Sequence, residues 1–282
     1  MTVSTAEITY SHRPRTGLGL SAWAEMGREL WASRELTWRL FQRDFSARYR
    51  QSVLGYLWAV VPVLVAVATF TWLNRAKVLP IAGTVLPYPV FLLLGLTVWQ
   101  LFASGLTSAT QSLVNAGSLI AKINFPRETL VLAATGQALV EFLIRAALVA
   151  LAFALYRTWP PWTIVLVPFA VIPLCLFTIG LGYVCALGNG ILRDTGQTIT
   201  LVLTFWMFLT PVVYPPPSGA GATLVNVLNP ISPFVIAAQD LATHGYLTQP
   251  GGYASACAAA LVVFLLGWRV FHLTEPRIAE RV

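Results

Sequence analysis

The sequence predicts an all-α integral membrane protein with six transmembrane helices, and three observations support this fold class. Hydrophobic residues make up 57% of the 282-residue chain and charged residues only 10%, with a mean hydropathy of +0.71. A soluble domain carries about 25% charged residues. Apolar runs of helical length recur along the chain, and the basic residues gather between alternate runs. These features place most of the chain in a bilayer.

The transmembrane helices are expected where an apolar run approaches the roughly 20 residues that a helix needs to cross the hydrocarbon core. Such runs occupy residues 53–73, 89–113, 130–156, 162–187, 198–214 and 253–272. The fifth run is short and ends in three consecutive prolines. We therefore divide the chain into a cytoplasmic N-terminal region, 1–52, and a transmembrane domain, 53–282.

The positions of lysine and arginine predict the orientation, since cytoplasmic loops of membrane proteins are enriched in both. With the N-terminus inside, the external loops carry only Arg75, Lys77 and Arg157. The cytoplasmic set is much larger: Arg13, Arg15, Arg28, Arg34, Arg39, Arg43, Arg48, Arg50, Lys122, Arg127, Arg193, Arg269, Arg277 and Arg281. The bias holds at both ends of the chain only for an even number of spans, so both termini are expected in the cytoplasm.

Between the fifth and sixth runs, the segment 215–252 is expected to be re-entrant on the outer side. Its apolar stretch, 224–241, is interrupted by Pro230 and Pro233. Proline removes a helical hydrogen bond and kinks or ends a helix. Two short helices that enter and leave the membrane from the same side fit this pattern better than a seventh span.

An amphipathic helix is expected before the first span. On a helical wheel starting at Ser33, a plausible N-cap, Trp38, Phe41, Phe45 and Tyr49 share one side. Arg39, Arg43 and Arg50 lie nearly opposite. This pattern is typical of a helix in the membrane interface. The arginines either follow the general cytoplasmic bias or bind an anionic lipid headgroup such as a diphosphate.

Signals for catalysis are few. The chain contains no Gly-Lys pair and so lacks the phosphate loop of P-loop ATPases. His12, His244 and His272 are scattered along the sequence, so no metal site is expected. A metal-dependent glycosyltransferase would need a pair of acidic residues at a membrane surface. The chain shows no such pair, which argues against this class of enzyme. We therefore expect a protein that is not an enzyme and that holds no cofactor.

Glu141 and Arg145 lie four residues apart in the third span, glutamate first, which suits an ion pair on one helix face. Charges inside a membrane are costly and are usually retained for a reason. The pair is interpreted as structural, facing the bundle interior. The alternative is a proton-coupled transporter that uses Glu141, although such a protein ordinarily needs more unpaired acidic groups.

Aromatic residues are frequent in the spans and at their edges. They belong either to the interfacial belts of a membrane protein or to a channel in which sugars stack on ring faces. The candidates for a channel lining are Tyr56, Trp58, Phe70, Trp99, Phe102, Phe205, Trp206 and Phe208.

The segment 117–129, between the second and third spans, is short, cytoplasmic and interrupted by proline. It is either an ordinary loop or a contact surface for a partner protein. Its central residues are Lys122, Ile123, Asn124, Phe125, Pro126, Arg127 and Glu128.

Several ordered motifs in the chain resemble one family. They are RDFSARYRQSVLGYLWAVVP at 43–62, KINFPRE at 122–128, ILRDT at 191–195, LTPVVYP at 209–215, Asn229-Pro230 with Pro233, and Phe271 with the terminal Glu280-Arg281-Val282. From about residue 36 onward the chain resembles the permease subunits of type 2 ABC exporters for polysaccharides, O-antigen and teichoic acids.

The resemblance implies a homodimer with two copies of a separate nucleotide-binding ATPase subunit, which would carry ATP and Mg²⁺. It implies export of a polysaccharide such as O-antigen on undecaprenyl diphosphate across the bacterial inner membrane. Membrane lipid is an expected partner and nucleic acid is not. Teichoic acid export, or export of a small molecule or lipid, are the alternatives within the same fold.

The resemblance also suggests roles for particular residues. Segment 117–129 would act as a gate moved by the ATPase, together with the N-terminal helix. The lipid diphosphate would be attracted by Arg39, Arg43, Arg48, Tyr49, Arg50 and Arg193, and the aromatic residues would let the glycan slide past.

Overall fold

The computed structural model describes residues 20–49, 55–79, 81, 83–123, 125–216 and 229–278. Within these ranges every regular element is a helix, which confirms the all-α prediction. Five helical segments are long and apolar enough to cross a membrane: Leu57–Arg75, Tyr88–Asn115, Glu128–Leu155, Trp162–Ile191 and Pro250–Glu275. The chain is therefore a multi-pass membrane protein.

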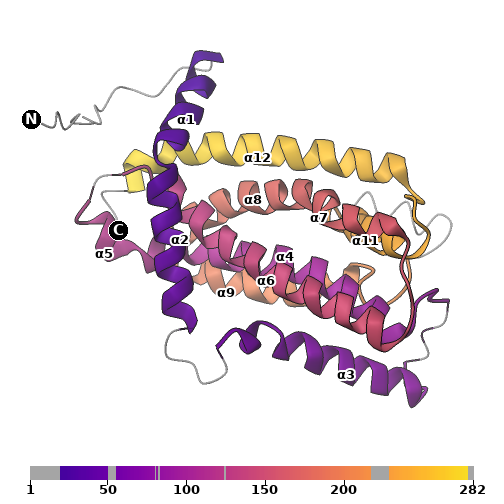
Figure 1. The fold of residues 1–282 in the computed structure, drawn as a ribbon. Helices are drawn as coiled ribbons and strands as arrows, with labels where there is room; N and C mark the ends of the chain where they lie inside the picture. Colours follow the sequence, from indigo (N-terminus) through magenta and orange to yellow (C-terminus); the bar gives the residue numbers. More distant parts are fainter. Residues whose placement is uncertain are drawn as a thin grey trace, which may run out of the picture.

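The long helices lie side by side in a bundle (Figure 1). It contains α4 (Tyr88–Asn115), α6 (Glu128–Leu155), α8 (Ile172–Ile191) and α12 (Pro250–Ile278). Of the apolar window in α4, 78% is buried, against 17% for the window around α3 (Val61–Arg75). Helix α4 is thus the central helix, and α3 lies along one side of the bundle (Figure 1).

Prolines mark where several helices begin. The predicted fourth span contains η2 (Trp162–Leu166), α7 (Val167–Ala170) and α8. Pro168 and Pro173 stand in the first turns of α7 and α8. Proline suits that position because its missing N–H has no helical partner there and its φ is already helical. The span is therefore a jointed helix.

The predicted fifth span corresponds to α9 (Asp194–Leu209), which has 16 residues. At 1.5 Å per residue it is about 24 Å long, shorter than a hydrocarbon core of about 30 Å. Only Leu203 of this helix is buried. The count of six spans thus stays a prediction, with five supported by helix length.

The segment 215–252, which the sequence predicts to be re-entrant, contains one described short helix, α11 (Ser232–Thr243), and every residue from Ser232 to Ala242 is buried. Asn229 connects the start of this helix to α9, because its Oδ1 accepts hydrogen bonds from the Ile231 N–H at 3.0 Å and from Trp206 Nε1 at 3.1 Å. With 12 residues, α11 is too short to cross a membrane. Residues 217–228 lie outside the described part, so the re-entrant pair remains a prediction.

Helices α8 and α12 approach closely at two glycines. A Cβ atom built on Gly267 would lie 2.1 Å from the carbonyl oxygen of Gly180. A Cβ on Gly180 would lie 2.5 Å from Cα of Phe264. Small residues let helix backbones approach in membranes, where packing and not water exclusion drives association. These two glycines therefore allow the tight crossing.

Two N-terminal helices, α1 (Leu20–Ala32) and α2 (Arg34–Tyr49), cross the bundle at one end (Figure 1). The same end contains α5 (Gly117–Ile120), the start of α6 and the last turns of α12. We call it the gate end. Trp23 of α1 and Trp268 of α12 meet there edge to face, with ring centroids 6.0 Å apart. The first and last described helices thus lie together.

Candidate functional site

The gate segment, 117–129, divides into an exposed half and a buried half. Lys122 and Ile123 are exposed, Ile123 by 56%. Phe125 is 7% exposed and belongs to a hydrophobic cluster with Leu130, Tyr183 and Phe271. Asn124 lies outside the described residues. The tip at Lys122 and Ile123 is therefore exposed, while the residues from Phe125 onward pack into the bundle.

The end of the gate segment is fastened to the last turns of α12. The backbone N–H of Arg127 donates to Glu275 Oε1 at 2.9 Å, and Nη1 of Arg127 donates to the Glu275 carbonyl at 3.0 Å. Burial lowers the pKa of Arg127, and the Glu275 carboxylate partly opposes that shift. One residue later, Glu128 Oε2 accepts from Trp268 Nε1 at 2.9 Å and Oε1 pairs with His272 Nδ1 at 2.7 Å. Pro126 is buried as well. Arg127 and Glu128 therefore anchor the segment.

The aromatic side of α2 packs along α6. Trp38, Phe41 and Phe45 form a stacked series with ring centroids 5.2 and 5.5 Å apart. Phe41 lies against Gly136, where an added Cβ would meet the ring at 3.3 Å. The aromatic side thus faces the bundle in part, and Trp38 remains 57% exposed.

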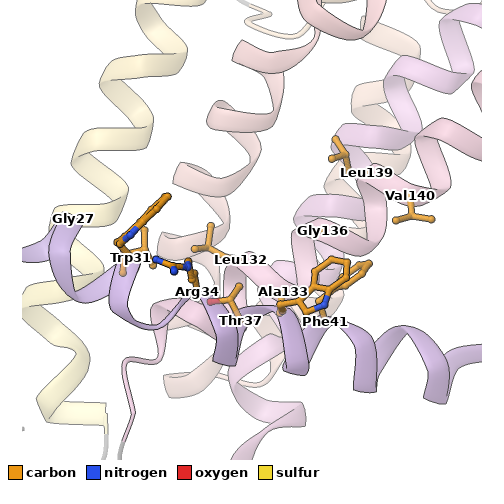
Figure 2. Close-up of a pocket in the computed structure, with 12 residues that line it drawn as sticks. Gly27, Trp31, Arg34, Thr37, Phe41, Leu132, Ala133, Gly136, Leu139 and Val140 are labelled. Carbon is orange, nitrogen blue, oxygen red and sulfur yellow. The ribbon is translucent and has the colours of Figure 1, made fainter. Parts of the chain in front are cut away.

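An apolar groove of about 490 Å³ lies between α1–α2 and α6 (Figure 2). Trp31, Phe41, Leu132 and Leu139 line it, and Arg34 is the one charged residue in its lining. The Arg34 guanidinium lies 4.8 Å from the ring centroid of Trp31, a cation–π contact. The groove thus offers an apolar slot with a cation at its rim.

Of the arginines proposed for a lipid diphosphate, the described ones lie on two different parts of the chain. Arg39 pairs with Glu35 at 2.6 Å and Arg43 with Asp44 at 2.7 Å, all on α2. The side chains of Arg48 and Tyr49, and all of Arg50, lie outside the described part. Arg193 is exposed between α8 and α9. Arg39 and Arg43 thus have acidic partners within α2, and Arg193 belongs to the α8–α9 connection.

A polar stripe runs along one face of α4. Its residues are Gln100, Ser104, Thr107, Gln111 and Asn115. Their spacing of three and four residues places them on one side of the helix. None of the five is buried. The stripe spans about 22 Å at 1.5 Å per residue.

The part of this stripe nearest the gate end opens into a hollow of about 560 Å³ between α4, α8 and α9. Amide, hydroxyl and guanidinium groups line it: Gln111, Asn115, Asn189, Arg193, Gln197, Thr200 and Thr204. Asn189 is fixed, because its Nδ2 donates to the Thr110 carbonyl at 3.0 Å and its Oδ1 accepts from the Gly196 N–H at 3.0 Å. Sugar hydroxyls and water bind to groups of this kind.

Residues 35–241 match the ABC-2 type transporter family. The chain belongs to this family. Among curated proteins, it is 28% identical over 262 residues to the O-antigen export system permease protein RfbA of Myxococcus xanthus, covering 90% of this chain and 98% of that one. Two Klebsiella pneumoniae proteins of the same name are 26% and 25% identical, each covering 84% of this chain and 91% of the relative.

The aromatic residues expected to line a channel in this ABC-2 type protein fall into two groups. Trp99 and Phe102 are 2% and 0% exposed and belong to the hydrophobic core, so in this structure they line no open surface. Trp206 packs edge to face on Phe102, and Phe70 packs against the same core. Three candidates remain well exposed: Trp58 at 54%, Phe205 at 65% and Phe208 at 52%. The side chain of Tyr56 lies outside the described part.

The ABC-2 type subunit does form the ion pair expected within its third span. Arg145 Nη2 donates to Glu141 Oε2 at 2.7 Å, and both residues are about 95% buried. Arg145 Nε also donates to the Ala59 carbonyl at 3.0 Å. A pocket of about 310 Å³ beside the pair is lined by Gln100 of the stripe and by Trp58. The pair thus ties α6 to the segment before α3.

His272 and Glu275 are the residues that sequence reasoning missed. They stand 144 and 147 positions after Glu128, and only the fold brings them together. A local signal existed: Trp268, His272 and Glu275 recur at helical spacing at the end of an apolar run. A polar face of this kind at the end of an apolar helix predicts that its side chains pair with polar groups of another element.

Proposed function

We propose that this chain is the permease subunit of an ATP-driven exporter that moves an O-antigen-type polysaccharide across the bacterial inner membrane. The curated relatives support the substrate class, because proteins named O-antigen export permeases align with most of the chain. The glycan would travel on an undecaprenyl diphosphate carrier. Teichoic acid remains the nearest alternative substrate.

The polar stripe on α4 is the observation that carries the proposal. Polar groups facing hydrocarbon are costly, so they normally mark a pathway or an interface in a membrane protein. This stripe continues into the hollow that contains Arg193, and a glycan with many hydroxyls needs an amide- and hydroxyl-lined route. An exporter of apolar lipids or drugs has less need of such a surface.

A second copy of the chain would complete the pathway. Helix α9 exposes large apolar residues next to the hollow, with Leu201 60% and Phe205 65% exposed. In a monomer the hollow is open on one side, and a homodimer would enclose it. In this arrangement α9 serves as the sixth span, both termini are cytoplasmic, and the outer segment including α11 forms the re-entrant cap.

Two nucleotide-binding subunits would supply the energy through the gate segment. Lys122 and Ile123 present a cation beside an exposed apolar side chain, which suits docking of a cytoplasmic protein. Their anchor at Glu128 and His272 would transmit movement directly to α6 and α12. The ATP and Mg²⁺ required would reside on those subunits.

The groove beneath α1–α2 would accept the prenyl chain of the carrier. Its lining is apolar and its rim carries Arg34, which can meet a diphosphate oxygen. This role adds Arg34 to the arginines expected from the sequence. Arg39 and Arg43 would first have to leave their partners Glu35 and Asp44.

The proposal is tested by co-expressing the chain with its nucleotide-binding subunit in glycan-producing cells that lack an exporter. We expect ATP-dependent appearance of glycan on the outer face, and no ATP hydrolysis by the purified chain alone. Replacing Gln111 by Leu should reduce export by up to about tenfold, because the pathway loses one hydrogen-bonding side chain. Gln42→Leu, on the exposed surface of α2, is the matched control.

Two results would contradict this function. One is ATP hydrolysis by the chain without its partner. The other is normal glycan export by Gln111→Leu together with loss of export by Gln42→Leu. That result would show that export depends on the polar surface of α2 and not on that of α4.

A further inference from the structure

We propose that Glu128, His272 and Glu275 form a binding site for one divalent transition-metal ion, which clamps the gate segment to α12. The inference is separate from the transport substrate and concerns the gate end of the bundle. It begins from geometry: one ligand atom from each of the three residues can be chosen so that all lie within 4.8 Å of one another.

The three residues are deeply buried and come from two helices. Glu128, His272 and Glu275 are 2%, 4% and 7% exposed. Glu128 is the first residue of α6, while His272 and Glu275 lie three positions apart on one face of α12. Two elements that are distant in sequence thus contribute an imidazole nitrogen and two carboxylates to one point.

Electrostatics favour a cation at this point. Taking a carboxylate out of water is costly unless an opposite charge or strong donors compensate for it. The donors from Trp268 Nε1 and from the Arg127 backbone N–H are uncharged, and the Arg127 guanidinium interacts electrostatically with Glu275. A histidine that binds a metal ion is neutral. With His272 neutral, Arg127 balances the charge of one carboxylate, and a bound cation would balance the other.

Tyr183 of α8 provides a second, independent observation. It is 0% exposed, and its hydroxyl finds no hydrogen-bond partner among the described residues. The hydroxyl interacts electrostatically with both Glu128 and Glu275. The ring is held by Phe271, with centroids 5.0 Å apart. A buried hydroxyl without a partner is unusual, and a metal ion or its bound water at the cluster would satisfy it.

The ligand set indicates which ions fit. One imidazole with two carboxylates and a neutral phenol or water suits Zn²⁺ or Mn²⁺ in preference to softer ions. Ligand bonds near 2.0–2.2 Å place neighbouring ligand atoms roughly 3.3 Å apart in a tetrahedral site. The present contact between His272 Nδ1 and Glu128 Oε1 is 2.7 Å. Binding would therefore need that contact to open by less than about 1 Å.

The experiment measures metal binding by the full chain, purified in detergent with an affinity tag that contains no histidine. After treatment with a chelator, Zn²⁺ and Mn²⁺ are each titrated by calorimetry, and the ion content per chain is measured after gel filtration. We expect one ion per chain and a higher unfolding temperature with the ion bound. Glu275→Gln and His272→Gln should abolish both effects.

Two controls separate this site from general binding. His244→Gln and Glu35→Gln change an exposed histidine and an exposed glutamate, and should leave the stoichiometry unchanged. Tyr183→Phe removes only the unpartnered hydroxyl, so the chain should fold and bind the ion with an affinity about tenfold weaker.

The proposal is overturned if the wild-type chain retains no ion and its unfolding temperature does not respond to Zn²⁺ or Mn²⁺. It is also overturned if His244→Gln removes the ion while His272→Gln keeps it. Both readouts use the isolated chain, so they do not depend on whether the chain exports a glycan.

Discussion

At the scale of single residues, burial separates roles that look alike in the sequence. Lys122 and Glu128 are both charged residues of the gate segment, yet Lys122 is exposed and Glu128 is 2% exposed with both carboxylate oxygens bonded. Phe102 and Phe205 are both aromatic residues of spans, but one is a core residue and the other is 65% exposed. Exposed and buried side chains thus alternate along short stretches of the chain.

The ion pair at Glu141 gives a prediction at this scale. Replacing Glu141 by Gln removes the carboxylate beside Arg145 and leaves a buried positive charge, which should cost about 3–5 kcal/mol of stability. We expect a lower unfolding temperature in detergent, measured by intrinsic fluorescence, and continued export by the molecules that fold.

A paired replacement, Glu141→Leu with Arg145→Met, is the control, since it removes both charges and should cost less than the single change. If Glu141→Gln folds at the wild-type temperature but transports nothing, the pair has the role of a proton carrier and the structural interpretation is wrong.

At the scale of elements, helix packing follows from where small and polar residues fall. Helix α4 can be central because apolar side chains cover most of its circumference, and its buried hydroxyls at Thr97, Thr110 and Ser112 donate to carbonyls of the same helix. Helices α8 and α12 can cross closely because Gly180 faces Gly267. The jointed fourth span follows from its prolines.

The glycine contact predicts a strong effect from one methyl group. Gly267→Ala would place Cβ 2.1 Å from the Gly180 carbonyl oxygen, a distance that forces the two helix backbones apart. Overpacking of this kind typically costs about 1–3 kcal/mol. We expect a clear fall in unfolding temperature and in the yield of monodisperse protein.

Gly251→Ala in the same helix is the matched control, because a Cβ there meets nothing within 4 Å. Equal effects of the two substitutions would show that helix propensity, and not the α8–α12 contact, determines the outcome.

At the scale of the whole molecule, some helices are well buried in the bundle and others leave most of their apolar side chains exposed. The window around α3 is 17% buried, and α9 buries only Leu203. The polar hollow lies beside α9. Lipid can cover an apolar helix, but it is a poor neighbour for amides and a guanidinium. The second copy of the chain proposed above would resolve this conflict.

Crosslinking tests the proposed dimer. In a variant lacking Cys175, Cys185 and Cys257, we expect Leu201→Cys on α9 to form a disulfide-linked dimer in membranes after mild oxidation. Leu143→Cys on α6, which is 55% exposed, should stay monomeric. If position 143 crosslinks and no position on the exposed face of α9 does, α9 is not at the dimer interface.

Much of the architecture could be anticipated from local patterns. Apolar runs predicted five helices that the structure supports by length, because hydrophobic length is a local property. The ion pair of Glu141 with Arg145 was predictable for the same reason, as both residues belong to one helix. The fifth run was harder, because 16 helical residues followed by prolines fit either a short span or a broken one.

The sequence by itself determined that this protein is a helical, multi-pass membrane protein with a basic, amphipathic helix before its first span and a proline-broken gate segment. These properties depend on composition and on spacing within single helices. Only the tertiary structure decided which residues face each other. It placed Trp99 and Phe102 in the core, brought Glu128 close to His272 and Glu275, and left none of the five residues of the α4 stripe buried. Contacts across more than a hundred residues depend on how helices pack, and helical spacing alone does not specify that packing.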